Sequence, residues 1–225
     1  MKNIHIYTHR KLKDYSLIVA DMDGTLYFDT PMRIIMCIEL FFYHLFHPWK
    51  IKDLLILITF RNIREGASIT DEEDFCSAQY DITALKFSVE PEYVRTIVHK
   101  WVHDIPMKWM YLFRDKKLIQ SLAQLREDGI KIVVFSDYPV KEKVARFGLE
   151  IDGSYSTSDT EINMLKPNRK GLDVISETMS VPCEEILVIG DRYEKDGRLA
   201  ENFNSDYIIL KKTSLPRRIQ LTKII

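Results

Sequence analysis

The sequence predicts an α/β fold: a doubly wound parallel sheet with an inserted helical segment. Short apolar runs that do not alternate with polar residues are typical of strands buried on both faces. Helical patterns separate the later runs, which favours βαβ units and therefore a parallel sheet. About a hundred residues with only helical patterns lie between the first run and the second, which indicates an insertion.

Four apolar runs are expected to form strands of the sheet. They are Leu17–Ala20, Ile130–Phe135, Ile186–Ile189 and Tyr207–Leu210. The helices expected beside them span Arg114–Arg126, Val140–Phe147, Asn168–Met179 and Glu194–Asn202. Gly129 and Gly148 follow the first two of these helices, at the position where glycine commonly ends a helix.

The insertion is expected to form a separate helical domain. A chain of 225 residues suits one core domain with a large insertion. We place the Rossmann-like core at residues 1–29 and 108–225, and the helical domain at residues 30–107. Residues 33–60 are strongly apolar, but charged residues and a proline interrupt them before the roughly 18 to 20 apolar residues that a transmembrane helix needs.

Composition limits the class of protein and its partners. A hydrophobic content of 46% is enough for a substantial core, and a formal charge of −1 gives no global attraction to nucleic acid or anionic lipid. The three cysteines form no CxxC pair, which predicts reduced thiols in a cytoplasmic protein. The polar N-terminal stretch MKNIHIYTHRKLKD lacks the apolar segment of a secretory signal.

Polar side chains follow the expected strands where each strand ends. Asp21 and Asp23 come after the first run, Ser136 after the second and Asp191 after the third. In an open parallel sheet, ligands bind beyond the carboxyl ends of the strands. If these strands are neighbours, residues far apart in the sequence converge on one site.

The stretch DMDG, which contains Asp21 and Asp23, has three interpretations. Aspartate and glycine are common in turns, so DMDG alone is compatible with a plain turn. A calcium-binding EF-hand loop is excluded, because the sixth and twelfth positions counted from Asp21 are leucine and methionine. The third interpretation is a Mg²⁺ site, favoured because Asp191 and Asp196 form a second carboxylate pair after a later strand. A cation would also relieve the repulsion between the two crowded carboxylates.

A phosphate group bound beside this cation would need further positive charge and hydrogen-bond donors. Lys166 precedes a predicted helix and can neutralise phosphate oxygens. Ser136 supplies a hydroxyl, and the backbone N–H groups of Gly24 and Thr25 are further candidate donors after the first strand. Each of these residues alone is a weak indication of a phosphate site. Their order along the chain and their positions after the strands together make the indication specific.

Four motifs together resemble the haloacid dehalogenase-like hydrolase superfamily. They are DMDGTL, the serine after IKIVVF, LKP and GDRYEKD, which follow one another in the family's order and spacing. The resemblance covers roughly residues 15–30 and 114–210. It implies that the insertion is the α-helical cap domain of the family's subgroup with a cap at this position.

The resemblance also implies a role for each motif residue. Asp21 resembles the nucleophile that forms an aspartyl-phosphate, and Asp23 the general acid and base. Ser136 and Lys166 would bind the transferring phosphoryl group. The implied Mg²⁺ site consists of the Asp21 carboxylate, the Asp23 backbone carbonyl and Asp191, with Asp196 acting indirectly or through water.

Asp23 favours phosphoryl chemistry within this family. Dehalogenases resemble the motif but lack the second aspartate, because a halide leaving group needs no proton. We therefore expect a Mg²⁺-dependent phosphatase that acts on a small phosphorylated metabolite. A phosphomutase or phosphotransferase with the same phosphoenzyme stays open, as does a non-catalytic binding protein that keeps the fold.

The helical insertion offers candidates for substrate recognition. Arg61 and Arg64 could bind a second anionic group of the substrate, although ordinary surface arginines are the more common outcome. His99 and His103 lie four residues apart, but no third metal ligand is evident, so ordinary helix-face histidines are favoured. The aromatic stretch ELFFYHLFHPW is expected in the core of the cap or in a homodimer contact; if it lines the cleft, the substrate carries an apolar part.

Overall fold

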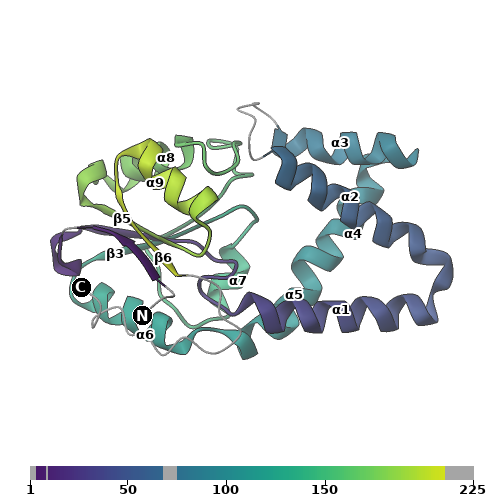
Figure 1. Ribbon diagram of the computed structural model, residues 1–225, viewed down its shortest axis with the longest axis horizontal. Helices are drawn as coiled ribbons and strands as arrows, with labels where there is room; N and C mark the ends of the chain where they lie inside the picture. Colours follow the sequence, from purple (N-terminus) through teal and green to yellow (C-terminus); the bar gives the residue numbers. More distant parts are fainter. Residues whose placement is uncertain (1–3, 9, 68–74, 211–225) are drawn as a thin grey trace.

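A computed structural model of the chain describes residues 4–8, 10–67 and 75–210 (Figure 1). Its centre is a six-stranded sheet in the order β1-β6-β5-β2-β3-β4. The strands are β1 (Ile4–Tyr7), β2 (Leu17–Ala20), β3 (Lys131–Ser136), β4 (Gly153–Ser156), β5 (Ile186–Gly190) and β6 (Asp206–Leu210). Strands β2 to β6 pair in parallel, and β1 pairs with β6 antiparallel.

The sheet confirms the predicted α/β class and adds two strands to it. The four predicted strands match β2, β3, β5 and β6 to within one residue at each end. The strands not predicted are β1 and β4, the two edges of the sheet. The β4 segment GSYS contains no continuous apolar run, and only one of its four residues is buried, so the pattern of a buried strand is missing.

Helices cover both faces of the sheet, which explains why the central strands are apolar throughout. One face of β2 packs Ile18 and Ala20 in a cluster with residues of α6 (Lys116–Glu127) and α7 (Lys141–Ala145). Leu17 and Val19 face the other way, toward α8 (Lys170–Met179) and α9 (Arg198–Phe203). Side chains alternate along a strand, so burial on both faces leaves no polar position in β2.

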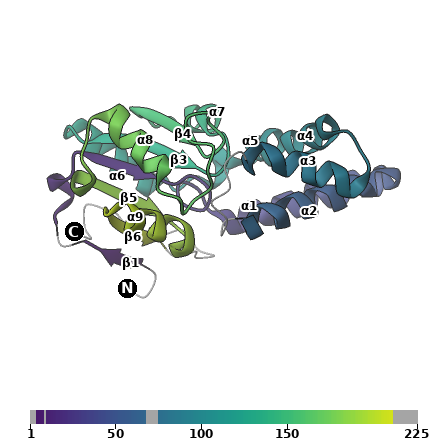
Figure 2. The same ribbon diagram turned by 90° about the horizontal axis from the view of Figure 1, so that it is seen from above.

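The helical insertion has a hydrophobic core of its own. It contains α1 (Asp29–Phe46), α2 (Ile51–Ala67), α3 (Phe75–Phe87), α4 (Pro91–Val98), a π-helical turn (His99–Asp104) and α5 (Ile105–Trp109). Ile56, Phe60, Val94 and Trp101 lie in its buried cluster. Figures 1 and 2 show these helices projecting to one side of the sheet. The division at residues 30 and 107 stays a prediction.

The apolar stretch of the insertion forms two separate helices joined by a short turn at Pro48–Lys50. Among the residues that the structure describes, no helix is long and apolar enough to cross a membrane.

Candidate active site

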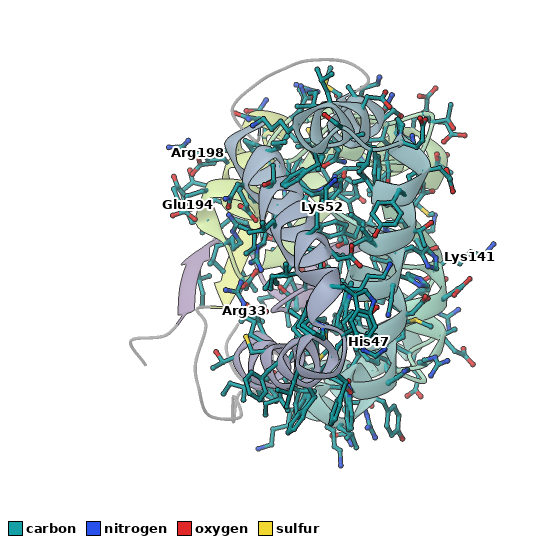
Figure 3. All side chains as sticks on the ribbon, turned by 90° about the vertical axis from the view of Figure 1, so that its right-hand side faces the viewer. Arg33, His47, Lys52, Lys141, Glu194 and Arg198 are labelled. Atoms are coloured by element: carbon teal, nitrogen blue, oxygen red, sulfur yellow. The ribbon has the colours of Figure 1, made fainter. Side chains whose placement is uncertain are left out.

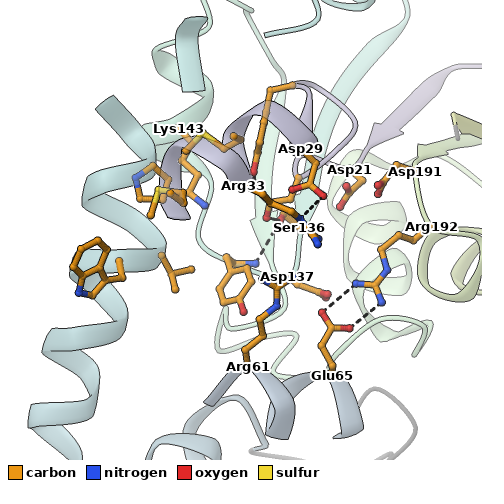
Figure 4. Close-up of a pocket in the computed structure, with 18 of the residues that line it drawn as sticks. Asp21, Asp29, Arg33, Arg61, Glu65, Ser136, Asp137, Lys143, Asp191 and Arg192 are labelled. Carbon is orange, nitrogen blue, oxygen red and sulfur yellow. Dashed lines mark hydrogen bonds and ion pairs between the residues drawn. The ribbon is translucent and has the colours of Figure 1, made fainter. Parts of the chain in front are cut away.

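Six of the predicted site residues converge at the carboxyl edge of the sheet, and Figure 4 labels Asp21, Ser136 and Asp191 among them. Strand β2 lies between β3 and β5, and its last residue, Ala20, is paired with Val134 on one side and Ile189 on the other. This register places the residues that follow the three strands around one cavity of about 500 Å³. The motif residues that line it are Asp21, Asp23, Ser136, Lys166, Asp191 and Asp196.

Both carboxylate oxygens of Asp21 accept hydrogen bonds. The residue is only 8% exposed, and its Oδ1 accepts a hydrogen bond from Lys166 Nζ at 2.8 Å. The Thr25 hydroxyl donates to Oδ2 at 3.2 Å, and the backbone N–H of Asp21 donates to Ile189 O at 2.8 Å. Burial raises the pKa of Asp21; Lys166 opposes this shift, and the neighbouring carboxylates increase it. The site is therefore short of positive charge.

Lys166 connects the two ends of the carboxylate cluster. Its buried ammonium donates to Asp21 Oδ1 at 2.8 Å, to Asp196 Oδ1 at 2.9 Å and to Phe135 O at 2.8 Å. Burial alone would lower the pKa of Lys166, but Asp196 and Asp21 outweigh it and raise the pKa, so the side chain stays protonated. The second oxygen of Asp196 accepts the backbone N–H of Arg192 at 3.2 Å. Asp196 is thus well placed to hold Lys166 in position.

Asp23 is oriented by two hydroxyl groups. Tyr27 donates to its Oδ1 at 2.5 Å, and Ser136 donates to its Oδ2 at 3.4 Å. Tyr27 was not among the predicted site residues, although its position four residues after Asp23 is a signal that could have indicated it. The tyrosine is buried and lines the same cavity.

The acidic cluster fits a divalent cation such as Mg²⁺. One carboxylate oxygen from each of Asp21, Asp191 and Asp196 lies within 4.8 Å of the others, and oxygen donors are those that Mg²⁺ prefers. Gly24 has φ +85°, and a Cβ there would lie 2.4 Å from Asp191 Oδ2. The turn therefore brings the backbone against this carboxylate in a way that only glycine permits.

Other cations near the cluster already have acidic partners. Lys195 forms a buried ion pair with Asp137, and Arg192 forms a bidentate pair with Glu65 at 2.8 and 3.2 Å. These pairs leave Lys166 as the cation that directly contacts the cluster among the described residues. A divalent cation would offset the remaining negative charge.

The structure separates the two arginines proposed for substrate recognition. Arg61 is exposed and lines the cavity. Arg64 is buried; its guanidinium donates to Asp137 O and to Thr157 Oγ1, the latter at 3.1 Å, and lies 4.4 Å from the centre of the Tyr138 ring. Arg64 therefore holds α2 against the sheet domain instead of facing the cavity.

The predicted phosphate donors of the first loop contact the carboxylate cluster and are not among the residues that line the cavity. Gly24 approaches Asp191, and Thr25 is fully buried with its hydroxyl directed at Asp21. Their role toward phosphate stays a prediction. His99 and His103 both contact the exposed Asp104 at 3.2 Å, outside this cavity.

Comparison with known proteins agrees with these motifs. A sequence model of the haloacid dehalogenase-like hydrolases matches residues 15–204. The chain belongs to this family. The resemblance predicted from the four motifs is thus confirmed, and the protein is a haloacid dehalogenase-like hydrolase.

Individual relatives of this hydrolase are distant. A 112-residue segment is 36% identical to glyceraldehyde 3-phosphate phosphatase of Methanopyrus kandleri, covering 48% of this chain and 47% of that protein. The match thus spans about half the length of that relative. The fold resembles the 2-haloacid dehalogenase of Pseudomonas syringae, with a TM-score of 0.57 and 15% identity over 86% of this chain and 85% of that one. It also resembles YfnB of Bacillus subtilis, solved bound to magnesium, with a TM-score of 0.55 and 14% identity over the same shares.

Proposed function

We propose that this hydrolase is a Mg²⁺-dependent phosphatase that cleaves the phosphate monoester of a small metabolite through an aspartyl-phosphate. One observation carries the proposal: Asp21, Lys166 and the hydroxyl-bound Asp23 line the same cavity. The relative from Methanopyrus kandleri, which bears the name of a phosphatase, supports the same class of reaction.

The geometry supports a reaction in two steps. A carboxylate oxygen of Asp21 attacks phosphorus, the bond from phosphorus to the leaving oxygen breaks, and protonated Asp23 gives its proton to that oxygen. Asp23 then removes a proton from water, which attacks the aspartyl-phosphate, releases inorganic phosphate and restores Asp21. During both steps, Lys166 offsets the negative charge of the phosphoryl oxygens, and Ser136 orients these oxygens.

The Mg²⁺ ion of this proposal would be held by Asp21, Asp191 and the backbone carbonyl of Asp23. When bound, it neutralises negative charge on the phosphoryl oxygens and on the nucleophile. Asp196 acts indirectly, because its two oxygens are already engaged by Lys166 and by the backbone of Arg192.

Metal dependence gives the first test. Chelation should remove the activity and Mg²⁺ should restore it, while Asp191→Asn should raise the Mg²⁺ concentration needed for half-maximal rate by at least about 100-fold. Phosphate release is measured against Mg²⁺ concentration, with the Mg²⁺-induced rise in Tm as a readout independent of turnover. Asp173→Asn is the matched control, because that carboxylate pairs with Arg169 on the exposed side of α8. An unchanged Mg²⁺ requirement in Asp191→Asn would contradict the metal assignment.

A panel of phosphorylated metabolites tests the reaction itself. Phosphate is measured with and without Mg²⁺ for sugar, polyol, nucleotide and lipid-like esters. Release of inorganic phosphate supports the phosphatase, whereas an isomerised or rephosphorylated product would indicate a mutase or transferase. No turnover across the panel, together with a tightly bound protein partner, would point to a binding protein.

We also propose that two copies of the chain associate through the outer face of the insertion. Exposed apolar residues follow helical spacing along α1 and α2; they are Ile34, Ile38, Phe41, Phe42, Leu45, Phe46, Ile51, Leu55 and Ile58. Figure 3 views the molecule from the side on which the insertion projects, with Arg33 on α1 and Lys52 on α2 labelled. The near-neutral chain, with a net charge of −1, favours a second copy over an anionic lipid surface.

Light scattering tests this association. The wild-type mass should be about twice the 26.5 kDa of one chain, and Phe42→Glu with Phe46→Glu should reduce it to one chain. Leu85→Glu, at an 83% exposed position on α3, should leave the mass unchanged. A monomeric wild type over the whole concentration range, or one that binds neutral vesicles instead, would contradict the proposal.

We propose the cytoplasm as the compartment of action. Cys37 is exposed and Cys183 is partly exposed, and both are free thiols. Exposed thiols persist best in a reducing compartment, which supports this location.

A further inference from the structure

The cavity at Asp21 has two chemically different walls. The wall formed by the sheet domain carries the carboxylates, Lys166 and Ser136. The helical insertion contributes mainly apolar side chains: Met32, Met36, Leu40, Leu57, Phe60 and Trp101. Ligand sites that are mostly apolar, with a few polar groups that fix orientation, are typical of small-molecule binding.

The apolar wall is part of a packed and well-supported structure. Phe60 and Trp101 are 1% and 5% exposed and belong to the hydrophobic core of the insertion. Met36, Leu40 and Leu57 are half-buried and pack against the same core, while also lining the cavity. These three side chains therefore offer apolar surface to a ligand without first having to move.

Apart from Arg61, which is exposed and lies on α2, the charged residues on the insertion's side of the cavity form ion pairs. Arg33 forms an ion pair with Asp29 at 2.8 Å, and Glu65 pairs with Arg192 at 2.8 Å (Figure 4). A substrate with several hydroxyl groups would place them against methyl, thioether and aromatic groups, which cannot replace their hydrogen bonds to water. A hydrocarbon group would instead bury apolar surface on both sides of the contact.

We infer that the substrate is a phosphate monoester of an apolar alcohol, alkyl or aryl, which this cavity binds by its hydrocarbon part. The phosphoryl group lies at Asp21 and Lys166, and the hydrocarbon group lies along Met36, Leu40 and Leu57. This inference rests on the proposed phosphatase function and specifies its substrate class. This substrate class differs from glyceraldehyde 3-phosphate, the polar compound for which the Methanopyrus kandleri relative is named. The match to that relative covers 48% of this chain.

A homologous series of alkyl phosphates tests the inference. From ethyl to octyl phosphate, kcat/KM should rise about fourfold for each added methylene until the cavity is filled. Glyceraldehyde 3-phosphate and polyol phosphates should give lower kcat/KM than alkyl esters of similar size. If kcat/KM does not change with alkyl chain length and polar esters are preferred, the proposed substrate class is wrong. The proposal that the protein is a phosphatase would still stand.

Paired variants locate the effect in the apolar wall. Leu40→Gln should lower the ratio of octyl to ethyl kcat/KM by at least about tenfold, because a polar group then faces the chain. Leu85→Gln is the control, since this residue is 83% exposed on α3 and does not line the cavity. Equal ratios in Leu40→Gln and the wild type would refute the placement of the chain.

Binding of alkylphosphonates separates failure of this inference from failure of the phosphatase proposal. Calorimetry should show Kd falling about fourfold per methylene even if no ester is hydrolysed. A Kd independent of chain length would overturn the apolar site whatever the enzyme hydrolyses. Turnover is then compared for monomeric octyl phosphate in solution and for dodecyl phosphate held in neutral vesicles. The comparison distinguishes a free substrate from one taken from a lipid surface. Either outcome supports an apolar phosphate monoester as the substrate class.

Discussion

Asp21→Asn is expected to lower phosphate release by at least about 10⁴-fold while the protein stays folded. An amide oxygen carries no full negative charge, so it cannot attack phosphorus as a carboxylate does. The fold should tolerate the change because Lys166 keeps its bonds to Asp196 and to Phe135 O. Phosphate release at saturating Mg²⁺ and the Tm of both proteins are the measurements, with Asp173→Asn as the matched control.

The stability of Asp21→Asn should depend on pH in a defined direction. Burial raises the folded-state pKa of Asp21, so this group favours folding below its unfolded pKa of ~3.9, and that contribution is lost as pH rises through the folded pKa. Without Mg²⁺, the variant should therefore gain stability relative to the wild type as pH rises toward neutrality, and Mg²⁺ should narrow the difference. If folded Asp21→Asn releases phosphate at close to the wild-type rate, the assignment of Asp21 as the nucleophile is wrong.

The core and the candidate site at the carboxyl edge of the sheet were predictable because they depend on local patterns. Central strands covered on both faces must be apolar throughout, so LIVA and ILVI were identified from composition alone. The polar residues directly after them then meet at one edge, since parallel neighbours end together. Register between β2, β3 and β5 brought Asp21, Ser136 and Asp191 into one cavity as expected.

The residues that were missed depend on packing between distant segments. Strand β4 contains no continuous apolar run, and β1 is an antiparallel edge strand. Arg61 and Arg64 lie one helical turn apart, and only the way α2 is packed, with Phe60 buried, determines which of them faces the cavity. The pairing of Glu65 with Arg192 likewise requires knowing that the end of α2 lies against the segment that follows β5.

Asp23→Asn is the second substitution with a large expected effect. A general acid and base contributes about 10²- to 10⁴-fold, so kcat should fall by that factor. The amide is isosteric and can still accept the Tyr27 hydroxyl, which donates to Asp23 at 2.5 Å, so the geometry of the loop should be kept. Both steps of the proposed reaction need a proton transfer at this residue, and each step can be measured separately.

The first step should show a dependence on the leaving group. An alkoxide needs a proton to leave, whereas 4-nitrophenolate leaves readily without one. Asp23→Asn should therefore slow formation of the phosphoenzyme much more for an alkyl ester than for 4-nitrophenyl phosphate. Rapid-mixing measurements of alcohol and phenol release give these rates directly. An equal loss for the two esters would argue against Asp23 as the acid.

The second step should make the phosphoenzyme accumulate. Without a base to activate water, Asp23→Asn should give a burst of 4-nitrophenol close to one equivalent, followed by slow phosphate release. Tyr27→Phe provides the matched comparison, because it leaves the carboxylate in place and removes only the hydroxyl that orients it. That variant should lower kcat less and change its pH profile, without a stoichiometric burst. A dehalogenase needs no proton at the leaving group, so a strong leaving-group dependence in Asp23→Asn would separate ester hydrolysis from the other chemistry of the family.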